Sequence, residues 1–223
     1  MKRKLLWDAL LKYIMGLAAV FLLLFIPAGT ISFQKGWILV TVVFLPMVPV
    51  GALLYFKKPE LLAKRLQAKE PEPEQKQAVL FSALMFLVGF VTAGLDFRFG
   101  WSRLPDGVTI GACIVLLLGY GIFGEVLREN NYLARTVEVQ KEQKLIDTGL
   151  YGLVRHPMYT ATLLIYWSMP LICGSGWALI PFLFYPLILR KRILNEEKVL
   201  EMGLPGYKEY TSRVRWKLIP GLW

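Results

Sequence analysis

Long uncharged runs separated by short, strongly basic segments are the main pattern of this 223-residue chain. A helix that crosses a bilayer needs about 20 mainly apolar residues. Four runs have about that length, and only the first carries charges, Asp8 and Lys12 near its start: 5–26, 36–56, 78–95 and 108–124. The pattern predicts four membrane-spanning helices in this part of the chain.

A fifth uncharged run, 158–189, is too long for one simple span and slightly short for two. Gly174, Ser175 and Gly176 lie at its centre, with proline on either side. Small residues and helix breakers at this place favour a tight helical hairpin. The sequence therefore predicts an all-α, polytopic transmembrane bundle of five or six spans, and we favour six.

Composition and charge agree with a membrane protein. A hydrophobic content of 56% and a mean hydropathy of +0.49 exclude an ordinary soluble domain. With the N-terminus in the cytosol and six spans, all but four of the 26 Lys and Arg residues fall in cytosolic segments; the exceptions are Lys12, Lys35, Arg98 and Arg103. This satisfies the positive-inside rule. Basic loops that face anionic lipid headgroups then explain the net charge of +10, and no nucleic acid partner is predicted.

The chain divides into a scaffold and a region that holds the polar chemistry. Residues 1–127 contain four spans and a cytosolic linker, 57–77, in which Pro71 and Pro73 stand among Lys and Glu. The first span follows a basic start, but it exceeds the roughly 7–15 residues of a signal-peptide core, so we expect it to be uncleaved. Residues 128–223 contain the hairpin and a polar C-terminal tail, and we expect both termini in the cytosol.

Metal and nucleotide sites are not predicted. His156 is the single histidine, and Cys113 and Cys173 both lie in apolar runs. These residues make no zinc or haem ligand set. Gly149 and Gly152 lack the spacing and the lysine of nucleotide-binding loops.

The sequence Arg155-His156-Pro157 marks a helix start, because proline suits the first turn and disfavours helix in the residue before it. Free N–H groups at such a start favour an anion. Arg155 adds a guanidinium fork, and Tyr159 lies within one turn of the same helix. A capping motif with a tyrosine anchor at the membrane interface explains these residues equally well.

An acidic pair follows the last uncharged run. Arg192 and Glu196 are four residues apart, so they share a helix face, whereas Glu197 is rotated by about 100°. A solvated surface ion pair is the usual meaning of such spacing. The position directly at the end of a long apolar run favours a site at the membrane interface instead.

These motifs in combination resemble the integral-membrane isoprenylcysteine carboxyl methyltransferase family, whose Arg-His-Pro-x-Tyr and Glu-Glu signature the phospholipid N-methyltransferases share. The resemblance covers about residues 128–220. It is carried by Arg-His-Pro-Met-Tyr at 155–159, Arg-Ile-Leu-Asn-Glu-Glu at 192–197, Gly-Tyr-Lys-Glu-Tyr at 206–210, Val-Arg-Trp-Lys-Leu-Ile-Pro at 214–220, and the upstream runs 130–132, 137–140 and 145–151.

The resemblance implies S-adenosylmethionine as methyl donor, S-adenosylhomocysteine as product, and a lipophilic or lipid-linked acceptor at the cytosolic membrane face. It implies catalytic roles for Arg192 and Glu196. Where eukaryotic members commonly have histidine this chain has Gln143, whose amide can still bind the cofactor. The cofactor-binding residues implied are Gln143, Tyr151, Arg155, His156, Pro157, Tyr159 and Glu197.

Two other functions fit parts of the sequence. A membrane sterol-type reductase that uses NADPH has a similar Arg-His-Pro-x-Tyr stretch, but such chains are usually longer. A small transport or scaffold protein predicts charges along a path through the midplane, whereas these predicted spans are nearly uncharged there. No endoplasmic-reticulum retrieval signal is evident, so we expect a multi-pass protein of a prokaryotic cytoplasmic membrane. The acceptor and the oligomeric state stay open.

Overall fold

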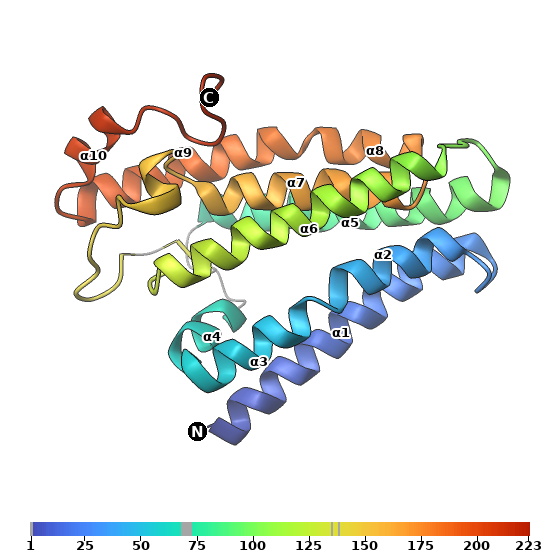
Figure 1. Ribbon diagram of the computed structural model, residues 1–223, viewed down its shortest axis with the longest axis horizontal. Coiled ribbons are helices and arrows are strands. Elements are labelled where there is room, and N and C mark those ends of the chain that lie inside the picture. The colour runs from blue at the N-terminus through green and yellow to red at the C-terminus, as the bar shows by residue number, and fades with distance from the viewer. Residues whose placement is uncertain (1, 68–72, 135, 138) are drawn as a thin grey trace.

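The computed structural model describes residues 2–67, 73–134, 136–137 and 139–223, and it forms a bundle of α-helices (Figure 1). No strand occurs in these ranges, which confirms the all-α class. Pro71 of the predicted linker and Glu138 of the predicted 137–140 motif lie outside the described residues. The elements are α1 (Lys2–Ala28), α2 (Gln34–Phe44), α3 (Met47–Lys57), α4 (Pro59–Leu66), α5 (Pro73–Phe99), α6 (Asp106–Glu129), the 3₁₀ turn η1 (Gly149–Gly152), α7 (Pro157–Ile172), α8 (Gly176–Leu183), α9 (Tyr185–Gly203) and α10 (Tyr207–Arg213).

The four predicted spans before residue 125 are present as helices. In the described part of the chain, four helices are long and apolar enough to cross a membrane: α1, α2 with α3, α5 and α6. The second span is broken between α2 and α3 at Pro46, whose missing N–H interrupts the helical hydrogen bonds. The other spans extend several residues beyond the uncharged runs, because polar residues continue a helix outside the apolar layer.

The predicted linker at 57–77 is largely helical in its described residues. Proline in the first turn starts α4, and the apolar face of α4 buries Leu61 and Leu62. Just before it, the Lys58 Nζ donates to the carbonyl oxygens of Leu127 and Arg128, at 3.0 and 3.1 Å. The linker is therefore attached to the C-terminal end of α6.

The predicted hairpin is formed by α7 and the pair α8–α9. Gly174 turns the chain with φ +73°, a backbone conformation that favours glycine, and Ser175 Oγ caps α8 by accepting from the Ala178 N–H at 3.0 Å. α7 lies close against α6 at Gly119, where an added Cβ would stand only 2.8 Å from the Ile165 side chain. α7 has 16 residues, so the count of five or six spans stays a prediction.

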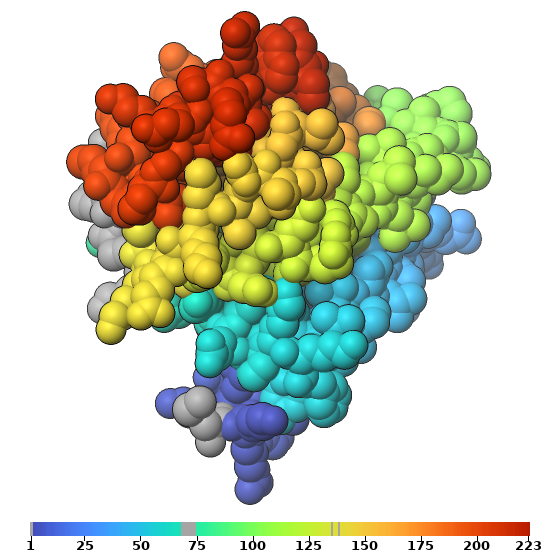
Figure 2. Space-filling model, turned by 60° about the vertical axis from the view of Figure 1, so that its left-hand side comes forward, coloured from blue at the N-terminus to red at the C-terminus, as the bar shows by residue number. Residues whose placement is uncertain are grey.

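One end of the bundle gathers the polar segments. In Figure 1 the N-terminus, α4, the segment 130–156 and α10 lie at the left, and the turns that connect α1 to α2, α5 to α6 and α7 to α8 lie at the right. Figure 2 shows the C-terminal segment (red) beside the segment 130–156 (yellow), which borders α3 and α4 (cyan). Two predicted polar clusters share this end of the molecule: the first is 155–159 at the start of α7, and the second is 192–197 on α9.

Candidate active site

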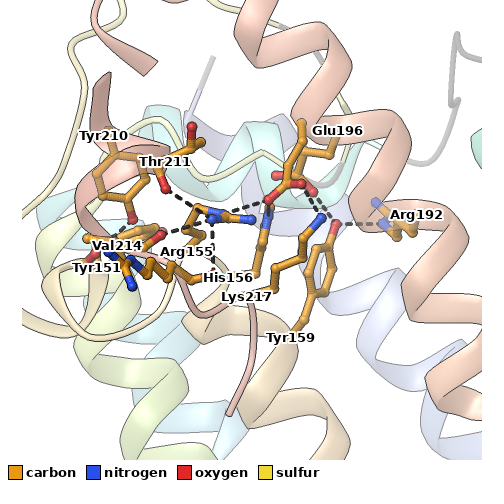
Figure 3. Close-up of polar contacts among 12 residues, drawn as sticks. Tyr151, Arg155, His156, Tyr159, Arg192, Glu196, Tyr210, Thr211, Val214 and Lys217 are labelled. Carbon is orange, nitrogen blue, oxygen red and sulfur yellow. Dashed lines mark hydrogen bonds and ion pairs between the residues drawn. The ribbon is translucent and has the colours of Figure 1, made fainter. Parts of the chain in front are cut away.

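The start of α7 brings the first cluster into the bundle. His156 is the residue before the helix and Pro157 occupies its first turn, which confirms the predicted helix start. His156, Pro157 and Tyr159 are all buried. The cluster points toward α9, which carries the second cluster (Figure 3).

Tyr159 links Glu196, the first residue of the acidic pair, to Arg192. Its hydroxyl donates to Glu196 Oε2 at 2.5 Å and accepts from Arg192 Nε at 2.8 Å (Figure 3). The Arg192 guanidinium also lies 5.8 Å from the centre of the Tyr159 ring. The predicted shared face of Arg192 and Glu196 is confirmed, and a tyrosine from another helix holds both side chains.

Glu197 points to a different set of partners. One carboxylate oxygen, Oε1, lies 2.8 Å from Arg155 Nε and 3.2 Å from His156 Nε2, and the other accepts from Lys217 Nζ at 2.5 Å. The Glu197 side chain is only 11% exposed. A carboxylate so enclosed needs charged partners, and here each partner comes from a segment outside α9.

These contacts set the ionisation of Glu197. Burial alone would raise its pKa, but hydrogen bonds from His156 and Lys217 and the charge of Arg155 outweigh burial and lower the pKa from 4.5 to about 2. The group is therefore ionised at neutral pH. Its ion pairs stabilise the folded state most where the carboxylate is charged in both the folded and the unfolded chain.

A pH series tests this arrangement. Because the folded pKa is depressed, the stabilisation from Glu197 is complete above pH 4.5 and is lost as the pH falls toward 2. We expect the melting-temperature difference between wild type and Glu197→Gln to shrink as the pH falls from 4.5 toward 2. A difference that does not change with pH would contradict the ion-paired state.

The C-terminal tail closes over the start of α7. The backbone N–H groups of Arg155 and His156 donate to the carbonyl oxygens of Trp216 and Lys217, both at 2.9 Å. The Arg155 Nη1 donates to the carbonyl of Val214 at 2.9 Å. Arg155 therefore orders the tail as well as pairing with Glu197. Lys217 belongs to the 214–220 motif but was not predicted as a site residue, because its contact with Glu197 depends on how the tail folds back.

A pocket at this end of the bundle, here called the end pocket, gathers most of the predicted site. Gln143, Tyr151, Arg155, His156, Pro157, Tyr159, Arg192 and Glu196 all line it, whereas Glu197 is not among its lining residues. Gln143 Oε1 accepts from the Gln140 N–H at 2.9 Å, and Tyr151 Oη accepts from Asn130 at 2.8 Å. The pocket wall also includes residues that were not predicted as site residues: Asn130, Tyr132, Leu133, Ala134, Thr136, Val137, Lys144, Leu145, Ile146, Met158, Leu200, Leu204, Tyr207 and Tyr210.

A second pocket, here called the inter-helix pocket, lies among α5, α7 and α9. Its wall includes Phe86, Tyr166, Tyr185 and Ile188, and Arg65 reaches it from α4. Met158, Tyr159 and Arg192 line both pockets. The Tyr159–Arg192 hydrogen bond therefore lies where the two pockets meet. Arg65 was not predicted as a site residue, because nothing in the sequence shows that the linker approaches the hairpin.

Metal ligands are not assembled at either pocket. Among the described residues, no group of three or more His, Cys, Asp or Glu side chains lies close enough to hold a metal ion. His156 Nε2 instead faces Glu197.

Comparisons with known proteins give one family and several partial relatives. The sequence model of the family described as phospholipid methyltransferase matches residues 108–204. The Delta(14)-sterol reductase TM7SF2 of Mus musculus is 27% identical over 134 residues, which cover 52% of this chain and 31% of the reductase. The Delta(14)-sterol reductase of Arabidopsis thaliana is 26% identical over 140 residues, covering 54% and 37%.

A bacterial protein is also similar. The cobalt-zinc-cadmium resistance protein CzcN of Cupriavidus metallidurans is 32% identical over 134 residues, which cover 57% of each chain. The chain thus spans about a third of the length of the two sterol reductases and somewhat over half of CzcN. The family match covers the α6–α9 region that holds Arg155, His156, Arg192 and Glu196. The resemblance to the isoprenylcysteine carboxyl methyltransferase and phospholipid methyltransferase type of family is confirmed over residues 108–204.

Proposed function

We propose that this protein is a membrane methyltransferase that uses S-adenosylmethionine and methylates a lipophilic or lipid-linked acceptor at the cytosolic membrane face. The observation that carries the proposal is the set Tyr159, Arg192 and Glu196 at the meeting point of two pockets. One pocket lies at the end of the bundle among polar segments. The other lies among helices, where Phe86, Ile188 and other apolar side chains line it together with Arg65, Arg192 and several hydroxyl groups. A water-soluble donor and a lipid-soluble acceptor need such a pair of sites.

The end pocket fits the cofactor by the chemistry of its side chains. S-adenosylmethionine, when bound, supplies an activated methyl group on a cationic sulfur. The Glu196 carboxylate attracts that cation, and the ring of Tyr159 presents an aromatic face to it. Gln143, Tyr151, Arg155, His156 and Pro157 would form the rest of the cofactor wall, as the family resemblance implies.

Arg192 and Glu196 would act on the acceptor. A carboxylate acceptor is already ionised, and the Arg192 guanidinium orients it by a forked hydrogen bond. A thiol or an amine must lose a proton, which Glu196 accepts. Tyr159 would fix both side chains in position, and accurate positioning is the main requirement of an in-line displacement.

Glu197 would support the site through its neighbours. Its carboxylate holds Arg155, His156 and Lys217, and the first two of these line the end pocket. The implied role of Glu197 in cofactor binding is then indirect, by orienting residues that touch the cofactor. Removing it would weaken binding by disordering that wall.

A sterol-type reductase is the second candidate, because two of the relatives carry that name. Such an enzyme would bind NADPH, whose phosphate groups require cationic partners. Arg155 is paired with Glu197, and Glu196 adds a carboxylate to the pocket wall. The same wall also holds Lys144 and Arg192, and the family match over residues 108–204 favours the methyltransferase. The described spans carry few charges near their middle, which disfavours a transport path.

Methyl transfer from labelled S-adenosylmethionine tests the proposal. Purified protein is incubated with the labelled donor and a lipid extract of the source cells, and extracted lipids are analysed by mass spectrometry. We expect label in one lipophilic product with wild type and far less label in that product with Glu196→Gln. Reduction of an added sterol by NADPH, without methyl transfer, would establish the second candidate instead.

A further inference from the structure

Tyr207 carries a buried hydroxyl that the site described above does not use. The residue begins α10 and is only 3% exposed. Tyr207 is among the residues that line the end pocket, yet its hydroxyl oxygen finds no hydrogen-bond partner among the residues that the structure describes. Buried hydroxyls are nearly always paired, so this one requires an explanation.

The missing partner has an energetic cost. Leaving a buried donor unsatisfied destabilises a protein, because the group loses its hydrogen bonds to water and gains none in return. Two other buried side-chain atoms share this condition in the described residues, Gln75 Oε1 and Asn195 Nδ2, but neither side chain lines the end pocket. Of these three unpaired groups, only the Tyr207 hydroxyl belongs to a residue of the end pocket, so a ligand in that pocket can supply its hydrogen-bond partner.

The surroundings of Tyr207 define what that ligand atom is. The ring packs in an apolar cluster with Leu204 and Tyr210, against Leu145 and Leu200. Burial raises the pKa of the Tyr207 hydroxyl, as do the nearby carboxylates Glu197 and Glu196, so the group stays a neutral donor. An anionic acceptor would be desolvated by the aliphatic side chains and repelled by the two carboxylates.

A flat, uncharged ring with acceptor nitrogens meets these conditions. Leucine and tyrosine side chains bind the faces of such rings by apolar contact and stacking. Arg192 and Glu196, which would face the reacting sulfur, also line the end pocket, so one ligand can contact them and Tyr207 together.

We infer that Tyr207 is a further cofactor-binding residue, whose hydroxyl donates a hydrogen bond to a ring nitrogen of the adenine group. The inference rests on the proposed function and adds to it the part of the pocket that recognises the base. It predicts that the Tyr207 hydroxyl destabilises the protein without ligand and stabilises the complex with the cofactor.

The Tyr207→Phe variant tests this inference by two measurements, the stability without ligand and the affinity for S-adenosylhomocysteine. Without ligand, we expect the variant to be as stable as wild type or more stable, because it removes an unpaired buried group. S-adenosylhomocysteine should bind about three- to tenfold more weakly, as expected for one neutral hydrogen bond. Tyr210→Phe is the matched control, because the Tyr210 hydroxyl already donates to the Tyr151 carbonyl at 2.7 Å, and its loss should destabilise the empty protein.

Ring-modified ligands identify the partner atom. In the 1-deaza, 3-deaza and 7-deaza analogues of S-adenosylhomocysteine, one ring nitrogen is replaced by C–H. One of them should bind wild type as weakly as the natural ligand binds Tyr207→Phe, and should lose nothing further on that variant. Unchanged affinity of Tyr207→Phe, or equal losses with all three analogues on both proteins, would overturn the inference. Failure of wild type to bind S-adenosylhomocysteine would reject the proposed function itself.

Discussion

Replacing Glu197 with alanine is expected to produce the largest loss of stability of any single change at this site. The change leaves the charges of Arg155 and Lys217, and the ring nitrogen of His156, without their buried carboxylate. Breaking a buried pair in this way costs about 3–5 kcal/mol. For a chain of this size we expect the melting temperature in detergent to fall by about 10 °C or more.

The same change should weaken cofactor binding, because Arg155 and His156 lose the group that holds them at the pocket wall. Glu201→Ala is the matched control: it lies on the same helix, its side chain is exposed, and its effect should stay within about 0.5 kcal/mol. If both variants melt like wild type, Glu197 is an ordinary solvated carboxylate and the proposed support of the pocket is wrong.

Replacing Glu196 with glutamine should have the largest effect on turnover. Glutamine keeps the shape of the side chain and an oxygen that accepts from the Tyr159 hydroxyl, so the fold should be retained. It removes the charge and the proton acceptor that the reaction would use. For a thiol or amine acceptor we expect methyl transfer to fall by about 10²–10⁴-fold, as for the loss of a general base.

The binding of S-adenosylhomocysteine separates this effect from a general disturbance. That ligand has a neutral sulfur, so its affinity for Glu196→Gln should stay near the wild-type value. Glu201→Gln serves as the control and should behave like wild type in both measurements. Wild-type turnover in Glu196→Gln would exclude Glu196 from the chemistry.

Much of the fold follows from local rules that a sequence displays. Uncharged runs of sufficient length define the spans, and a glycine and a serine between two apolar segments define the hairpin turn. Pro157 fixes the start of α7, and helical spacing places Arg192 and Glu196 on one face. Each of these predictions depends on residues close together in the chain.

Contacts between distant segments could not be predicted in the same way. The pairing of Glu197 with Lys217 depends on how the tail returns to α7, and the approach of Arg65 to the hairpin depends on the packing of α4. The separation into a scaffold and a methyltransferase-like region at residue 127 stays a prediction. Lys64 donates to Gln140 at 2.5 Å, so α4 of the scaffold directly contacts the segment that forms the pocket wall.

Titration calorimetry of the purified protein with S-adenosylhomocysteine and, separately, with NADPH tests the central proposal most directly. The proposed methyltransferase function predicts saturable binding of S-adenosylhomocysteine by wild type, weaker binding by Glu197→Ala, and no comparable binding of NADPH. Saturable binding of NADPH together with no heat from S-adenosylhomocysteine, while a soluble methyltransferase gives a normal titration under the same conditions, would contradict it.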